Sequence, residues 1–82
     1  MAGEHGLLVF DSTSLALKTE RLLKSTGVPC TVIPTPVEIT AECGIALLFK
    51  GEWLDKAAEV IASFENGSCQ LLFPFERKRT DE

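Results

Sequence analysis

The sequence has no excess of positive charge, and this limits the partners that the chain can attract. Its 82 residues carry 12 acidic and 8 basic side chains, for a formal net charge of -4 at pH 7. Overall charge of this sign does not draw a protein to phosphate backbones or to anionic lipid surfaces. We therefore expect no nucleic-acid partner and no membrane surface.

Long apolar runs are also absent. No run reaches the about 18 residues that a membrane-spanning helix needs. The first five residues lack the cationic start and the apolar centre of a signal peptide. These two absences predict a cytoplasmic protein.

Metal-ligating residues are scarce. The chain has one histidine and three cysteines, Cys30, Cys43 and Cys69, which form neither a CxxC pair nor a zinc pattern. We expect no metal and no other cofactor. In the reducing cytoplasm the three cysteines should be free thiols.

What the sequence does contain is the composition of a small globular domain, with 45% hydrophobic and 24% charged residues. A chain of this length buries only about 60% of its unfolded surface, which leaves little room for a deep active-site cavity. We predict a single domain over residues 1–82. Its ordered core should span about 6–75, and residues 76–82 should be a frayed tail.

Four strands and two helices are expected. Continuous apolar runs at residues 6–10 and 45–49 predict strands buried on both faces. The runs at 29–34 and 69–75 contain prolines, which cannot donate to a sheet ladder, so we place them at sheet edges. Apolar residues at helical spacing predict a helix of about 13 residues between a cap at Ser12 and a stop at Gly27, and a second helix at 53–64.

The order of these elements is strand, helix, strand, strand, helix, strand, which is the ferredoxin-like pattern. We predict an α+β sandwich of βαββαβ order, with a four-stranded antiparallel sheet and two helices on one of its faces. A different small α/β sandwich is the alternative.

Cys43 is the residue on which the functional interpretation depends. It follows an irregular loop and precedes Gly44 at the start of a central strand. The predicted topology brings this loop to the sheet end where the first helix begins, near Ser12 and Thr13. A helix N-terminus favours a thiolate, and Gly44 allows a ligand or a partner to approach closely.

Other predicted neighbours oppose this activation. Asp11, Glu38 and Glu42 are expected at the same sheet end, where their negative charges disfavour a thiolate. His5 is expected at the opposite end, so a Cys-His pair and a hydrolytic cysteine enzyme are not expected. The alternative is that Cys43 is a small buried residue at a strand end.

The other two cysteines are interpreted mainly as packing residues. Cys69 should lie at the same sheet end as Cys43, with one strand between them. Strand spacing then separates them by roughly 9 to 10 Å, too far for a disulfide. Cys30 belongs to the opposite end of the sheet.

Three motifs carry a resemblance to a known family. They are a Pro-x-Pro loop at residues 34–36 that leads to Cys43-Gly44, a strand end with a Ser/Thr cluster at 9–13, and a Glu-x-x-Leu stretch that starts at Glu20. In these features the chain resembles the selenium/sulfur (Se/S) carrier protein-like family over about residues 7–73. Val37 stands where that family often has an arginine, which removes a cation that would stabilise an anion or a thiolate.

The resemblance implies a sulfur or selenium carrier that holds a persulfide or selenosulfide on Cys43. Gly44, Ser12 and Thr13 would be its substrate-binding residues, and a donor protein and an acceptor protein its partners. It would be an accessory protein more than an enzyme. The alternative is a non-catalytic interaction or ligand-sensing module, which could be a homodimer, with a structural Cys43.

Overall fold

The computed structural model describes residues 4–36, 39, 43–64 and 68–75. The predicted frayed tail, and the predicted neighbours Glu38 and Glu42, lie outside these residues, and the division into a single domain stays a prediction. The elements are β1 (His5–Phe10), α1 (Thr13–Ser25), β2 (Thr31–Pro34), β3 (Ile45–Lys50), a short 3-10 helix η1 (Gly51–Trp53), α2 (Leu54–Ile61) and β4 (Cys69–Phe75).

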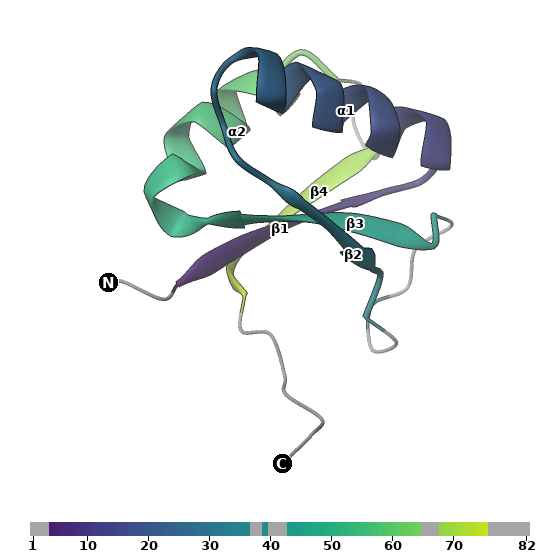
Figure 1. Cartoon of the computed structure of the whole chain (residues 1–82). Coiled ribbons are helices and arrows are strands. Elements are labelled where there is room, and N and C mark those ends of the chain that lie inside the picture. The colour runs from purple at the N-terminus through teal and green to yellow at the C-terminus, as the bar shows by residue number, and fades with distance from the viewer. Residues whose placement is uncertain (1–3, 37–38, 40–42, 65–67, 76–82) are drawn as a thin grey trace.

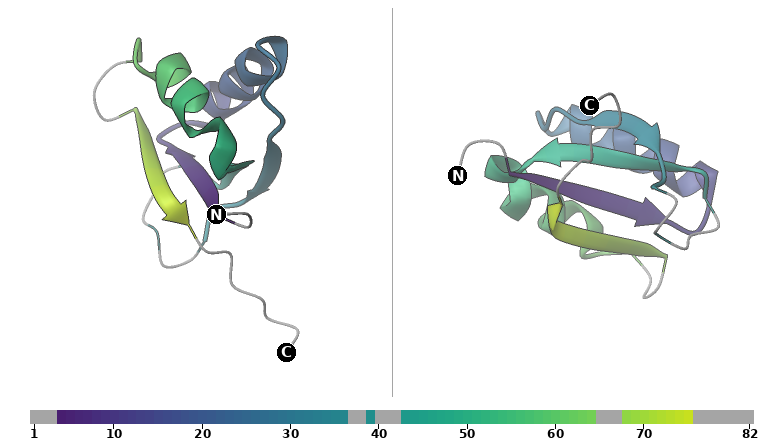
Figure 2. Two further views of the ribbon diagram at one scale, coloured as in Figure 1. Left: turned by 90° about the vertical axis from the view of Figure 1, so that its left-hand side faces the viewer. Right: turned by 90° about the horizontal axis from the view of Figure 1, so that it is seen from below.

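The four strands form one antiparallel sheet in the order β2-β3-β1-β4. Both helices cover one face of this sheet (Figures 1 and 2). The predicted α+β, ferredoxin-like arrangement is confirmed. The two continuous apolar runs are the central strands, and the two strands that contain prolines are the edges.

Helix α1 begins and ends where its sequence predicts. Ser12 has an extended backbone, and its hydroxyl oxygen accepts a hydrogen bond from the Leu15 N–H at 3.2 Å. Gly27 follows the helix with a φ of 89°, a conformation that glycine adopts without strain. One detail differs from the helical pattern. Leu22 is exposed, although its helical spacing from Leu15 and Thr19 predicts a position on the same buried face.

The second helix is shorter than predicted at both ends. The chain leaves β3 through η1, and α2 begins only at Leu54. Beyond Ile61 the backbone hydrogen bonds join residues three positions apart. The N–H groups of Ala62 and Phe64 donate to the carbonyls of Glu59 and Ile61. These bonds wind the chain more tightly than an α-helix. The apolar pattern therefore predicts a helix that continues over residues 62–64, whereas α2 ends at Ile61.

Apolar side chains are buried on both faces of the sheet. Because side chains alternate along a strand, each central strand contributes to both clusters, which accounts for the two continuous apolar runs. Between sheet and helices lie Leu8, Phe10, Ala16, Leu23, Val28, Cys43, Leu47, Phe49 and Ala57, and on the other face lie Leu7, Val9, Ile33, Ala46 and Leu48. Within the described chain, neither helix has the length and apolar character needed to cross a membrane.

Candidate functional site

Cys43 lies beside the N-terminus of α1. Strands β1 and β3 are antiparallel, so the residues just before β3 lie next to the end of β1, where α1 begins (Figure 1). The Cys43 N–H donates to the carbonyl of Phe10 at 3.4 Å. Its sulfur lies 3.5 Å from the hydroxyl oxygen of Thr13, the first residue of the helix. The structure thus brings together the cysteine and the helix start, as the topology predicts.

Two main-chain groups of Ile45 also contact this sulfur. The Ile45 N–H donates to Sγ at 3.4 Å, and the thiol donates to the Ile45 carbonyl at 3.3 Å. A hydroxyl can rotate to donate or to accept, so Thr13 suits either state of the sulfur. The carbonyl stabilises the thiol, whereas the N–H and the Thr13 hydroxyl can donate to a thiolate. The site therefore holds partners for both protonation states.

The Cys43 side chain is buried, with 2% of the residue exposed. It packs in the cluster between sheet and helices, which includes Phe10 and Ala16. This burial matches the alternative expectation of a small core residue at a strand end. A bulky reagent cannot reach the sulfur in this conformation, so any chemistry at Cys43 requires local opening.

Gly44 is exposed, and a Cβ atom placed there would meet no atom of the described residues within 4 Å. Crowding by these residues therefore does not require the glycine. The backbone is held by Thr35, whose hydroxyl donates to the Cys43 carbonyl and whose N–H donates to the Gly44 carbonyl, both at 3.0 Å. Sequence reasoning missed Thr35. Its position between Pro34 and Pro36 was a signal, because neither proline has an N–H and Thr35 alone can donate.

The other residues considered in the sequence lie at the two ends of the sheet, Ser12 and Asp11 near Cys43 and His5 far from it. Ser12 uses its hydroxyl to cap α1, and the exposed Asp11 donates its N–H to the Ser68 carbonyl at 3.2 Å. Thr13, in contrast, contacts the Cys43 sulfur with its hydroxyl. At the far end of the sheet, His5 pairs with Lys50 in the β1–β3 register. His5 is thus placed where the topology predicts, away from Cys43.

The other two thiols are poor candidates for thiolates. Cys69 pairs with Phe10 in the β1–β4 ladder. Burial, and then the negative charge of Asp11, raise the pKa of Cys69 to about 12. Burial and the carboxylate of Glu20 raise the pKa of Cys30, although Lys24 opposes them. All three cysteines are free, and no cluster of three or more metal-ligating side chains occurs in the described ranges.

Comparison with known proteins adds one match. Neither the curated proteins nor the solved structures contain a match to this chain. A family model described as "Putative Se/S carrier protein-like" matches residues 5–67, which include β1 through α2 and the Cys43-Gly44 pair. This span is more than half of the sequence and agrees with the resemblance carried by its motifs. The chain belongs to the Se/S carrier protein-like family.

Proposed function

We propose that this protein carries sulfur or selenium on Cys43, as a persulfide or a selenosulfide. The observation that supports it is the set of hydrogen-bonding groups at one sulfur, the Thr13 hydroxyl and the Ile45 N–H, at the start of α1. The pKa values of Cys30 and Cys69 are both raised, which makes these two thiols poor acceptors. Membership of the family supports the same role.

The loading step is a thiol exchange without net oxidation. The Cys43 thiolate attacks the terminal sulfur of a donor persulfide, a new S–S bond forms to Cys43, and the donor's S–S bond breaks. The electron pair leaves with the donor's thiolate. In delivery, a thiolate of an acceptor protein attacks the same terminal sulfur, and Cys43 leaves as the thiolate. Both partners are proteins in this proposal.

Access to the sulfur is a necessary part of the proposal, because Cys43 is 2% exposed. The two hydrogen bonds from Thr35 hold the Cys43-Gly44 backbone in its present position. Their breakage would free this backbone and let a donor approach beside the exposed Gly44. Loading would then be limited by how often this end of the sheet opens.

The proposal is tested by incubating the protein with glutathione persulfide and measuring the intact mass. The wild-type protein should gain one sulfur atom, and Cys43→Ser should gain none. Cys30→Ser and Cys69→Ser are matched controls that should load as the wild type does. Equal loading of wild type and Cys43→Ser, or no loading of either, would contradict the proposal.

The burial of Cys43 favours a second candidate, a non-catalytic interaction or ligand-sensing module in which this cysteine is structural. Alkylation of the native protein at graded pH separates the two candidates. Labelling of Cys43 well below the pH at which an ordinary thiol ionises supports the carrier. Protection of Cys43 until the protein is denatured supports the module.

A further inference from the structure

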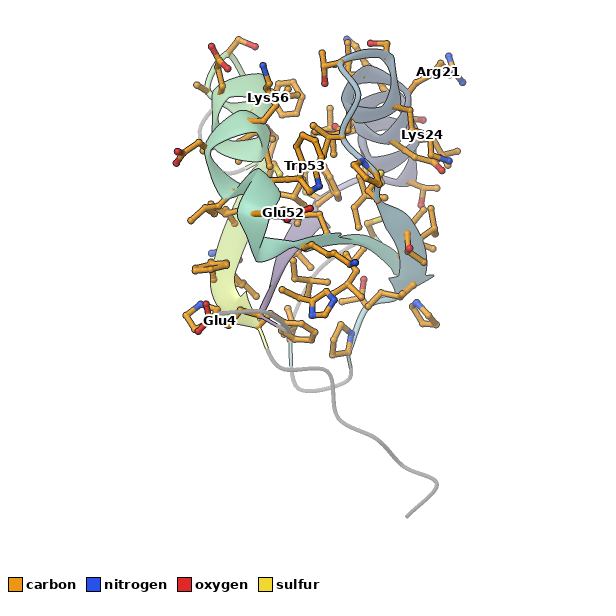
Figure 3. The ribbon with its side chains drawn as sticks, turned by 60° about the vertical axis from the view of Figure 1, so that its left-hand side comes forward. Glu4, Arg21, Lys24, Glu52, Trp53 and Lys56 are labelled. Carbon is orange, nitrogen blue, oxygen red and sulfur yellow. The ribbon has the colours of Figure 1, made fainter. Side chains whose placement is uncertain are left out.

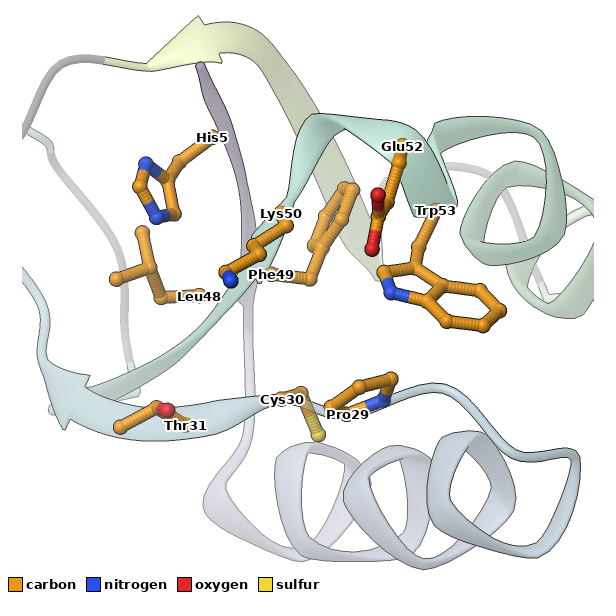
Figure 4. Close-up of a pocket in the computed structure, with 9 residues that line it drawn as sticks. All are labelled: His5, Pro29, Cys30, Thr31, Leu48, Phe49, Lys50, Glu52 and Trp53. Atoms are coloured by element: carbon orange, nitrogen blue, oxygen red, sulfur yellow. The ribbon is translucent and has the colours of Figure 1, made fainter. Parts of the chain in front are cut away.

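A second site lies at the opposite end of the sheet from Cys43. Here the chain leaves β3 through η1 and passes the segment that enters β2, and a pocket of about 290 Å³ lies between them (Figure 4). Its volume is at the lower end of the about 300–1,000 Å³ typical of ligand sites, so it suits a small molecule. Nine described residues line it, among them the polar His5, Lys50, Glu52 and Trp53 and the apolar Pro29 and Phe49.

Trp53 supplies an unexplained polar group in this pocket. Its Nε1 atom is buried and has no hydrogen-bond partner among the described residues. A buried N–H without an acceptor destabilises the folded state, and such groups are rare in native proteins. Figure 4 shows the nitrogen edge of the indole on the side that faces Lys50 and Phe49. An acceptor atom of a ligand would satisfy this N–H.

Two charged side chains of opposite sign border the same space. Lys50 and Glu52 are both exposed and both line the pocket. Figure 4 shows the Lys50 ammonium on the side of His5 and Leu48, and the Glu52 carboxylate beside Trp53. In Figure 3, Glu52 lies next to Trp53 at the base of α2. These long side chains can rotate, which opens a path to the buried indole nitrogen.

This combination of charges selects among ligand classes. A simple carboxylate would be attracted by Lys50 and by the Trp53 N–H but repelled by Glu52. A simple amine would be attracted by Glu52 but repelled by Lys50. A molecule with both a carboxylate and an ammonium group satisfies all three residues. Phe49 and Pro29 add an apolar wall, which favours an apolar substituent on that molecule.

We propose that this pocket binds a free α-amino acid with an apolar side chain. Its carboxylate accepts hydrogen bonds from Lys50 and from the Trp53 N–H, and its ammonium group pairs with Glu52. The side chain packs on Phe49 and Pro29. The pocket is separated from Cys43 by the length of β1 and β3, so this proposal does not depend on the carrier function.

The sole tryptophan of the chain makes the test direct. L-leucine is titrated into the wild-type protein while Trp53 emission and the amide NMR signals of Cys30 and Lys50 are recorded. Saturable changes are expected, with affinity in the millimolar range for so small a ligand. 4-Methylpentanoate and 3-methylbutylamine, which each lack one charged group of leucine, should bind at least about tenfold more weakly.

Matched variants test the residues. Lys50→Gln and Glu52→Gln should each weaken leucine binding about tenfold. Lys56→Gln and Glu59→Gln, which change exposed residues of α2 that do not line the pocket, should bind as the wild type does. The proposal is overturned by an absence of saturable change in both signals, by equal binding of 4-methylpentanoate, or by wild-type affinity in the two pocket variants. Persulfide loading of Cys43 should be unchanged in all four variants.

Discussion

The sulfur of Cys43 lies 3.5 Å from the hydroxyl oxygen of Thr13, a residue thirty positions earlier in the chain. This contact places a thiol at the first turn of α1, where unpaired N–H groups and the helix dipole favour negative charge. The same thiol is almost completely buried. One side chain therefore combines hydrogen-bond donors for a thiolate with poor access, and the two properties can be tested separately.

The Thr13 hydroxyl is the first feature to test. Thr13→Val keeps the shape of the side chain and removes its hydrogen bond, so Cys43 should react roughly three- to tenfold more slowly with iodoacetamide. Thr13→Ser keeps the hydroxyl and should react at nearly the wild-type rate. Site-resolved mass spectrometry of the alkylated protein gives both rates. Equal rates for Thr13→Val and the wild type would show that the hydroxyl does not assist the thiolate.

The raised pKa of Cys69 predicts that the folded protein loses stability in alkaline solution. Its pKa is about 12 in the folded protein, against an ordinary value of 9.0. Between these values the unfolded chain has released this proton and the folded protein has kept it. The free energy of unfolding should therefore fall as the pH rises from about 9 toward 12, and this thiol should cause no change below that window.

Urea unfolding at about pH 8 and about pH 10.5 measures this effect. Cys69→Ala, which lacks the titrating group, should lose less stability between the two pH values than the wild type. Because other groups also titrate in this range, the difference between the two proteins is the quantity to compare. An equal loss in both would contradict the assignment to Cys69.

Gly6 and Gly44 should differ in how much stability is lost when each is replaced by alanine. A Cβ atom at Gly6 would collide with the ring of Phe49, which is only 2% exposed and cannot easily move. Gly6→Ala should therefore lower the free energy of unfolding by about 1–3 kcal/mol. The methyl group of Gly44→Ala would meet no described residue within 4 Å, so this variant should stay within about 0.5 kcal/mol of the wild type. Urea unfolding of the three proteins decides the matter, and a large loss in Gly44→Ala would reveal a constraint at that position.

The cap of α1 gives a further prediction. Ser12→Ala removes the acceptor of the Leu15 N–H and should cost about 1 kcal/mol of stability. Ser14→Ala changes an exposed residue of the first turn and should be close to neutral, because alanine is a good helix former. Thermal unfolding of both variants provides the comparison. Similar losses in the two variants would argue against a capping role for Ser12.

The sheet order was predictable because two kinds of local chemistry agree. Pro34 and Pro74 mark edge strands, since a proline cannot donate to a ladder, and the uninterrupted apolar runs mark strands that pack on both faces. Ser12 and Gly27 gave the limits of α1 for equally local reasons. Once the order of the strands was known, the meeting of Cys43 and Thr13 followed from geometry.

Features that depend on packing were not predictable from the pattern. The apolar periodicity around Ala62 continues past the true end of α2, because tight turns there use the same residue types. The burial of the Cys43 sulfur and the exposure of Leu22 depend on how neighbouring side chains fill space. The pocket beside Trp53 arises where η1 meets the segment that enters β2, two parts of the chain with no shared sequence signal.

The position of Phe10 between Cys43 and Cys69 bears on how long a persulfide on Cys43 would last. The Phe10 carbonyl accepts a hydrogen bond from the Cys43 N–H, and Phe10 pairs with Cys69 in the β1–β4 ladder. Strand β1 therefore lies between these two cysteines. Cys30 is at the far end of the molecule. A persulfide on Cys43 would therefore find no thiol of its own chain to discharge it. Under the proposed carrier function, the persulfide would stay on Cys43 until an acceptor protein arrived, and that acceptor would set the lifetime of the loaded form.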